Sequence, residues 1–353
     1  PKLDGTLVRH WDSWIEGTPE FGALRAWSPT KNDVDQFYET ALTNNATFSF
    51  SKADENYSIR TSVNYIEQNG IVPNSKKEQT RVTINTKYNI TDKFEFYANM
   101  NYENRYILNN PDQNYGNLGS NMNQWWQRQL DFKRLKNYEV NGQILSWNIK
   151  SHTNVAASYW DMPYFHSYEN FKNDYKNAVF GKVGANYTFN DNLRLTAEVR
   201  RTFNSYAQDD RGTTKSLLDQ PFYYEFMSRV KQNELFTMLN YNKKFMDDML
   251  DLDVSIGAEV TEYAYKNLDA RTVGGLTIPG FYNLAGSKDP VTVDTDITNW
   301  ESRGTFLKAS LGYKDMAYLD GSYRLDGRST AKPTANRIET YGVSASFLAH
   351  KVL

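Results

Sequence analysis

Apolar and polar residues alternate along much of this chain with a period of two, which is typical of β-strands whose two faces meet different surroundings. Residues 79–90 place Val82 and Ile84 on one side and polar residues such as Arg81 on the other. After a short turn, the same alternation continues through residues 94–103. The two segments therefore predict a tight β-hairpin with one apolar and one polar face.

The alternation recurs along the chain and predicts about eleven strands of roughly 8–13 residues, longer than the usual ~5–6 of soluble proteins and close to the ~9–11 that a tilted membrane strand needs. Short turns are expected near residues 52–55, 91–92, 190–192, 246–249 and 314–315. Long excursions are expected at residues 68–78, 105–177, 206–232, 265–302 and 327–338. Short turns at one rim and long loops at the other indicate an all-β fold, a transmembrane antiparallel up-and-down β-barrel.

In such a barrel one side of each strand faces lipid, and the other faces a wet lumen. The lumen side is expected to carry the charged positions of the alternating segments. These positions are Arg60, Arg81, Lys87, Glu95, Arg194, Glu198, Arg200, Asp251, Glu259, Lys308 and Arg324.

The amino-acid composition also fits a sheet whose two faces meet different solvents, lipid on one side and water on the other. Only 39% of the residues are hydrophobic and the mean hydropathy is −0.71, yet 15% are aromatic, far more than a disordered segment carries. A barrel wall reconciles these values because only every second side chain is lipid-facing. A soluble β-sandwich also alternates, but loops of this length would be unusual in one.

Several classes of function are disfavoured. No apolar run reaches the ~18 residues of a spanning helix, and the chain has no cysteine. The net charge of −2 lacks the basic footprint of a nucleic-acid partner. No phosphate-binding glycine motif is present, and the four histidines are scattered, with only His152 and His166 in one loop. No catalytic residue, metal site or cofactor is expected.

Residues 32–75 carry a resemblance to a known family. The segments Phe37-Tyr38-Glu39-Thr40-Ala41 and Asn44-Asn45-Ala46-Thr47-Phe48 precede the most specific motif, Gly70-Ile71-Val72-Pro73-Asn74-Ser75. Together with the strand Tyr318-Leu319-Asp320-Gly321-Ser322-Tyr323-Arg324-Leu325-Asp326-Gly327, they resemble the early and middle barrel of SusC/RagA-like TonB-linked outer membrane transporters. In the family the latter strand leads into a Phe-Gly-like loop, which Arg328-Ser329-Thr330 partly replaces here.

The resemblance implies a barrel of about 22 strands, of which this chain would supply about half. It also implies a multi-pass protein of the cell outer membrane that imports bulky nutrients, either glycan oligosaccharides or peptides. The implied partners are a SusD-like lipoprotein lid, the TonB complex acting through an N-terminal plug, and outer-membrane lipid and lipopolysaccharide. The chain begins without a signal peptide, and we expect the plug and the C-terminal strands to lie outside it.

The expected organisation has two parts. Residues 1–43 form an extracellular loop region that enters the barrel. Residues 44–349 form barrel strands with long extracellular loops at 105–177, 206–232 and 265–302.

The first of these loops concentrates aromatic residues, which stack on sugars and also contact peptides. The candidate ligand-binding residues are Trp125, Trp126, Trp147, Tyr159, Trp160 and Tyr164. An alternative is that these rings form the core of an extracellular subdomain or a docking surface for the lipoprotein, since large aromatics are commonest in cores and interfaces.

Two other functions stay open from the sequence. A passive porin would share the alternation and the loop layout, but it lacks a plug and has ~16–18 strands. An outer-membrane enzyme would need a Ser/His/Asp or Asp/His cluster at one rim.

Overall fold

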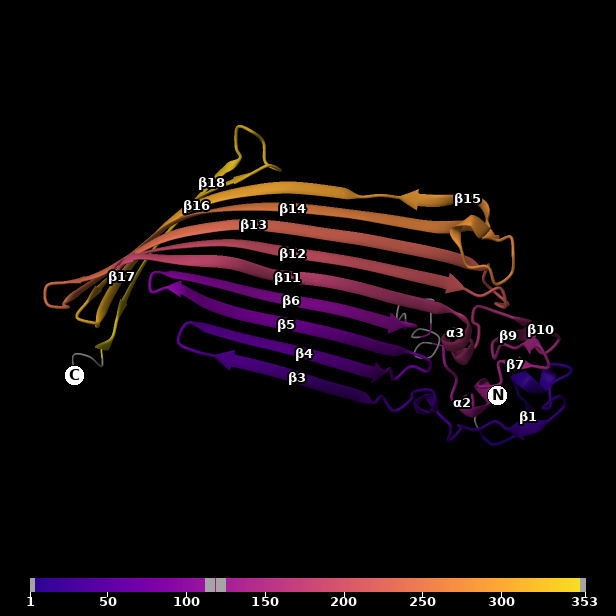
Figure 1. Cartoon of the computed structure of the whole chain (residues 1–353). Helices are drawn as coiled ribbons and strands as arrows, with labels where there is room; N and C mark the ends of the chain where they lie inside the picture. Colours follow the sequence, from indigo (N-terminus) through magenta and orange to yellow (C-terminus); the bar gives the residue numbers. More distant parts are fainter. Residues whose placement is uncertain (1–3, 112–117, 119–124, 350–353) are drawn as a thin grey trace.

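The computed structural model describes residues 4–111, 118 and 125–349, and its main feature is one large antiparallel sheet (Figure 1). Within these residues the sheet has 12 strands, and eleven of them follow one another in the order β3-β4-β5-β6-β11-β12-β13-β14-β16-β17-β18. The strands are β3 (Thr43–Ala53), β4 (Tyr57–Asn69), β5 (Lys76–Thr91), β6 (Phe94–Leu108), β11 (Phe171–Asn190), β12 (Leu193–Gly212), β13 (Phe222–Phe245), β14 (Leu250–Leu276), β15 (Ser287–Asp294), β16 (Ile297–Tyr313), β17 (Ala317–Arg328) and β18 (Arg337–Phe347).

The strands of the sheet pair in the order in which they follow one another along the chain. The exception is the short β15, which pairs with the C-terminal part of β14 from Asp269 to Leu276. Short turns join the strands at one rim; at Lys314 and Asp315 both residues have positive φ, 49° and 52°. Three residues, Lys314 to Met316, separate the paired residues Tyr313 and Ala317, and the positive φ values let this tight turn follow the twist of the strands. The longer connections and the small elements gather at the opposite rim (Figure 1), so the predicted up-and-down layout with about eleven strands is confirmed.

Several strands are much longer than the sequence predicted. β13 has 24 residues and β14 has 27, so the loops expected at 206–232 and 265–302 shrink to the short segments between β12 and β13 and between β14 and β15. The long loop runs only from β6 to β11, not over all of 105–177. The alternation predicts each strand only as far as its apolar row continues, but the strands extend beyond that row with charged residues such as Arg201 and Lys231 among aromatic and apolar ones.

The two faces of the sheet differ as the alternation predicted. The charged side chains from Arg60 to Arg324 that were assigned to one side share a face by cross-strand register; we call it the polar face. The opposite, apolar face exposes large hydrophobic side chains over many strands: Met100, Val183, Val199, Leu235, Ile256, Leu307, Leu319, Tyr323, Tyr341 and Val343.

The small elements at the loop rim come from two distant parts of the chain. The N-terminal part holds β1 (Leu7–Arg9), η1 (Trp11–Trp14), β2 (Leu24–Ala26) and η2 (Val34–Gln36). The loop between β6 and β11 holds α2 (Phe132–Leu135), β7 (Glu139–Val140), β8 (Gln143–Ile144), β9 (Ile149–Ser151), β10 (Asn154–Ala157) and α3 (Pro163–Glu169). In the described residues, no helix has the length and hydropathy to span a membrane.

Candidate functional site

Residues 4–42 and 125–170 fold together at the loop rim, and we call this unit the cap. Its core is a buried cluster that includes Phe37 from the first segment and Phe132, Met162 and Phe165 from the second. Phe37 packs edge-on against Tyr164, with ring centroids 5.0 Å apart. The expected loop region 1–43 is therefore one half of a packed subdomain that needs the long loop as its other half.

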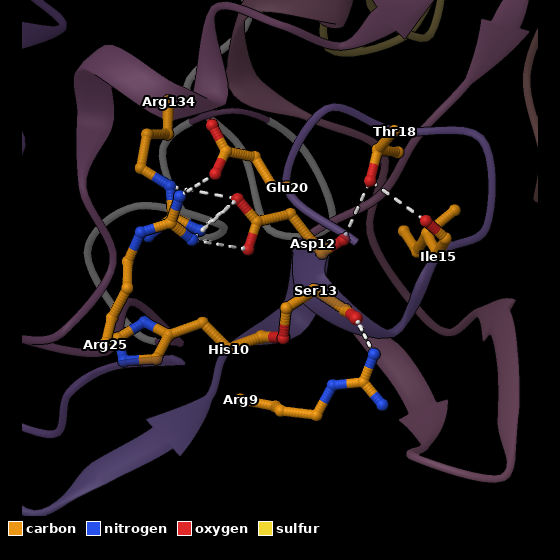
Figure 2. A network of polar contacts seen from close by, with 9 residues as sticks. All are labelled: Arg9, His10, Asp12, Ser13, Ile15, Thr18, Glu20, Arg25 and Arg134. Carbon is orange, nitrogen blue, oxygen red and sulfur yellow. Dashed lines mark hydrogen bonds and ion pairs between the residues drawn. The ribbon is translucent and has the colours of Figure 1, made fainter. Parts of the chain in front are cut away.

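A buried charge cluster joins the two halves of the cap (Figure 2). Asp12, which is 4% exposed, accepts a hydrogen bond from Arg134 Nε at 2.9 Å and lies 3.3 Å from Arg25 Nη1. Arg25 also pairs with Glu20, nearer the surface. Because two guanidinium groups neutralise and bond one carboxylate, the charge is compensated where water is largely excluded.

The structure divides the six predicted ligand-binding aromatics into three groups. Trp147 and Tyr164 are buried in the cap core, with 6% and 3% exposure, and the Tyr164 hydroxyl donates to the Gln36 carbonyl at 3.1 Å. Trp126 and Trp160 pack against that core. The packing alternative therefore accounts for these four rings, because their faces are used within the protein.

Trp125 and Tyr159 differ from the other four aromatics. They are 52% and 82% exposed, and Tyr159 has a positive φ of 59°, a conformation that is uncommon for residues other than glycine. These two rings are therefore the candidates that can still contact a ligand or a partner protein.

The motif Gly70 to Ser75 forms the tight loop between β4 and β5 and attaches the sheet to the cap. Gly70 N donates to Ser75 O at 2.8 Å, while Val72 enters the cap core. The Asn74 side chain donates to the Ser167 carbonyl of α3 at 2.8 Å, and Ser75 Oγ donates to the Val72 carbonyl. In the structure, the motif is a connection between sheet and cap; only Ile71 is strongly exposed, at 57%.

We expect Gly70→Ala to disrupt this connection. A Cβ at Gly70 would lie 1.8 Å from Ser75 Oγ, so that hydroxyl must move and give up its hydrogen bond to the Val72 carbonyl, at a cost of about 1–3 kcal/mol of unfolding free energy. Faster hydrogen exchange in residues 70–75 and in α3 would report the change. Ile71→Ala removes an exposed side chain of the same loop and is expected to leave exchange unaltered; equal effects of the two substitutions would contradict the prediction.

His166 lies on α3 and lines a cavity of about 150 Å³ together with Val72 and Phe171. The Asn170 amide nitrogen lies 3.2 Å from Nδ1. Burial lowers the pKa of His166 below its ordinary value, although the carboxylates of Asp161 and Asp219 act in the opposite direction. His152, the other histidine of this loop, instead packs against Trp14 at 5.3 Å, and the described residues contain no group of three metal-ligating side chains.

This lowered pKa predicts that the cap loses stability in acid. The unfolded state titrates near pH 6.5 and binds the proton more readily than the fold does, so stability falls as the pH drops below about 6.5 and levels off below the folded-state pKa. Hydrogen exchange of the cap, corrected for intrinsic rates and compared between pH 7.5 and 5.5, measures this. The variant His166→Gln should show a smaller difference, and an unchanged difference would refute the assignment.

The polar face carries a network of ion pairs across several strands. Glu198 of β12 is 5% exposed; it accepts from Lys182 Nζ at 2.8 Å and from the Tyr97 hydroxyl at 2.5 Å. Arg200 joins Glu198 to Glu234 of β13. These contacts link four strands, β6, β11, β12 and β13, through charges that an apolar solvent would not tolerate unpaired.

The polar face also carries aromatic rings that the sequence analysis did not identify. Phe236 and Phe306 stack with centroids 6.0 Å apart, and the Arg200 guanidinium lies 4.7 Å from the Phe236 centroid. Closer to the loop rim, Tyr263 of β14 and Trp300 of β16 stack with centroids 5.0 Å apart and an interplanar angle of 13°. A glycine within a strand was the sequence signal for this pair. Gly257 lies directly opposite Phe306, and the absence of a side chain at Gly257 leaves room for the Phe306 ring.

No protein-family model and no curated protein sequence matches this chain. Solved structures do match. The structure of the RagAB peptide importer in the "open-open" state aligns with a TM-score of 0.74 and 18% identity, over 90% of this chain and 35% of that chain. The "closed-closed" state aligns with a TM-score of 0.71 over 90% and 36% of the two chains, again at 18% identity.

The outer membrane transporter YddB from Escherichia coli aligns with a TM-score of 0.54 and 10% identity, over 86% of this chain and 36% of that chain. This chain thus spans about a third of the length of the structures it matches. These likenesses identify the fold: the chain forms a large antiparallel up-and-down sheet like part of the RagAB structures, and the all-β fold class predicted from the sequence is confirmed.

Proposed function

We propose that this chain is the middle part of a TonB-dependent importer of bulky nutrients in the outer membrane. The observation that carries the proposal is the two-faced sheet, which has the fold of the RagAB importer wall and exposes an apolar row on one face and ion pairs on the other. Large side chains such as Ile256, 56% exposed, and Val199, 57% exposed, would be costly in water but suit the hydrocarbon of a bilayer.

In this proposal the polar face lines the lumen and meets water, the plug or the cargo. The stacked pair Tyr263 and Trp300 lies on that face in the half of the strands nearer the cap, where it offers flat apolar rings beside polar side chains. Such a surface suits peptide side chains or the C–H faces of sugars. Peptides are the first class to test, because RagAB is a peptide importer, and glycan oligosaccharides are the second.

The proposal includes a SusD-like lipoprotein above the loop rim. Trp125 and Tyr159 of the cap are exposed aromatics of the kind enriched in protein interfaces. A lid seated there would close over cargo that enters between the cap and the polar face.

Transport is tested with the complete gene product in cells that lack their own copy. We expect uptake of labelled peptides or oligosaccharides to return with the wild-type gene and to stop when a protonophore collapses the proton gradient. Uptake that persists after the collapse would instead identify a passive pore. Trp300→Ala should weaken uptake of large cargo, whereas Trp147→Phe, within the cap core, should not.

The partner is tested by purifying the tagged complete protein together with the lipoprotein encoded beside it. A stable complex that Tyr159→Ala together with Trp125→Ala weakens would support the lid position. Copurification that is indifferent to both substitutions would place the lipoprotein elsewhere.

A further inference from the structure

Four cations gather on the polar face where β5, β6 and β11 approach the cap (Figure 1). Arg105 of β6 is the central one, because its cross-strand partners are Gln79 of β5 and Lys176 of β11. Lys77 and Arg81 lie two positions to either side of Gln79, so they share its face of β5. We call Lys77, Arg81, Arg105 and Lys176 the basic patch.

Only part of this positive charge is neutralised. Within the described residues, the ion pairs of the basic patch all go to Glu103, which lies 3.4 Å from Arg81 and 3.3 Å from Lys176. Asp174, two positions from Lys176 on the same face of β11, is 4% exposed and accepts hydrogen bonds from one hydroxyl and two side-chain amides, all uncharged. The four cations therefore face two carboxylates, and two positive charges are left in excess.

Arg105 carries much of that excess. Its side chain is partly exposed, and its Nε is buried without a hydrogen-bond partner. Among the residues that the structure describes, no carboxylate lies within ion-pair distance of its guanidinium group. A charged donor that is partly removed from water and left unbonded is unfavourable, so an arriving acceptor oxygen would bind tightly there.

The basic patch lies on the route that the proposed function gives to cargo. Arg105 is five residues beyond Met100 of the apolar row, towards the loop rim, which is about 17 Å along a strand at ~3.3 Å per residue. Beyond β6, Asn109 donates a hydrogen bond to the Ser167 carbonyl of the cap. Cargo that enters between the cap and the polar face therefore passes the basic patch.

We propose that Arg105, at the centre of the basic patch, binds the free carboxylate of an imported peptide. A guanidinium group can bind both oxygens of a carboxylate at once, and the surrounding unpaired charge attracts an anion. No aromatic ring belongs to the patch, so it lacks the stacking surface that suits sugars. The inference rests on the proposed importer function and deepens it by naming the group on the cargo that the wall recognises.

The test measures binding of two short fluorescent peptides to the complete protein in detergent, by fluorescence anisotropy. The peptides share one neutral sequence; one ends in a free carboxylate and the other in an amide. We expect the wild type to bind the carboxylate form about tenfold more tightly. Arg105→Gln should abolish this difference, whereas the matched control Arg60→Gln, an exposed cation of the same face near the opposite rim, should preserve it.

A second variant separates recognition from misfolding. Arg105→Glu should reverse the preference, so that the amide form binds more tightly than the carboxylate form, and a misfolded protein cannot produce such a reversal. Equal affinity of the wild type for the two peptides would overturn the proposal. The same loss of preference in Arg105→Gln and Arg60→Gln would overturn it too.

An acidic oligosaccharide, oligogalacturonate, is the third probe. Binding of this glycan that depends on Arg105, without any binding of peptide, would reject the peptide carboxylate as the ligand. A protein that imports both peptides equally well in cells would refute this inference alone. A protein that imports neither peptides nor oligosaccharides would refute the proposed function.

Discussion

Replacing Asp12 with asparagine is expected to loosen the cap more than any other single change considered. The amide would keep the shape of the side chain but leave the guanidinium groups of Arg25 and Arg134 without their shared counter-charge, in a site where the Asp12 side chain is 5% exposed. Removing one partner of a buried ion pair costs about 3–5 kcal/mol. Hydrogen exchange in β1, η1 and α2 should rise together, because Asp12 joins both halves of the cap.

The matched control is Glu20→Gln, which alters the outer contact to Arg25. Glu20 is 41% exposed at its side chain, and exposed ion pairs contribute about 0–1 kcal/mol. The strands β11 to β14 should keep their protection in both variants. If Asp12→Asn and Glu20→Gln raise exchange equally, the buried cluster is not what holds the cap together.

The cap itself could not be predicted from the sequence, because its bonds join residues that are far apart in the chain. Asp12 and Arg134 are 122 positions apart, and Tyr164 bonds a carbonyl 128 positions away. A periodic pattern carries information only about near neighbours. The aromatic concentration in the long loop signalled a packed or binding surface, and only the structure could show which rings are buried.

The wall was predictable because its two faces meet different surroundings at every second residue. A shift of one position would turn each apolar row towards the polar face, so the register of β5, β6 and β14 follows from the sequence. The strand ends could not be predicted from the sequence. Beyond the apolar row the strands continue with charged residues on the outward face, such as Arg201, Lys231 and Glu262. The prediction treated the end of the apolar row as the end of the strand, whereas hydrogen bonding continues well beyond it.

The motif at Gly70 to Ser75 was predicted as a family motif, and in the structure it connects the sheet to the cap. Its glycine is needed for the close approach of Ser75, and its Asn74 holds α3. The stacked pair Tyr263 and Trp300 was missed because residues 265–302 were expected to form a loop, whereas Trp300 lies in β16. Pairing across β14 and β16 stacks them on the polar face.

The assignment of the two faces makes a strong prediction at neighbouring positions of β5. Ile84 lies in the apolar row beside Met100, which is 40% exposed, whereas Asn85 is exposed on the polar face opposite Asn99. Arginine at position 84 must enter hydrocarbon near the middle of the membrane, so Ile84→Arg should cost about 2–4 kcal/mol of folding free energy. Arginine at position 85 meets water or polar groups, so Asn85→Arg should change stability by less than about 1 kcal/mol.

Urea unfolding of the complete protein in lipid vesicles measures both variants. Ser255, on the polar face of β14, is a less suitable control than Asn85. Ser255 is only 8% exposed and its Oγ accepts a hydrogen bond from Asn240. Arginine at position 255 would therefore destabilise the fold through packing, whichever solvent the face meets. Val254→Arg on β14 repeats the test on a second strand. Equal losses for Ile84→Arg and Asn85→Arg would mean that the two faces share one solvent, and no membrane-spanning wall could then be built from this sheet.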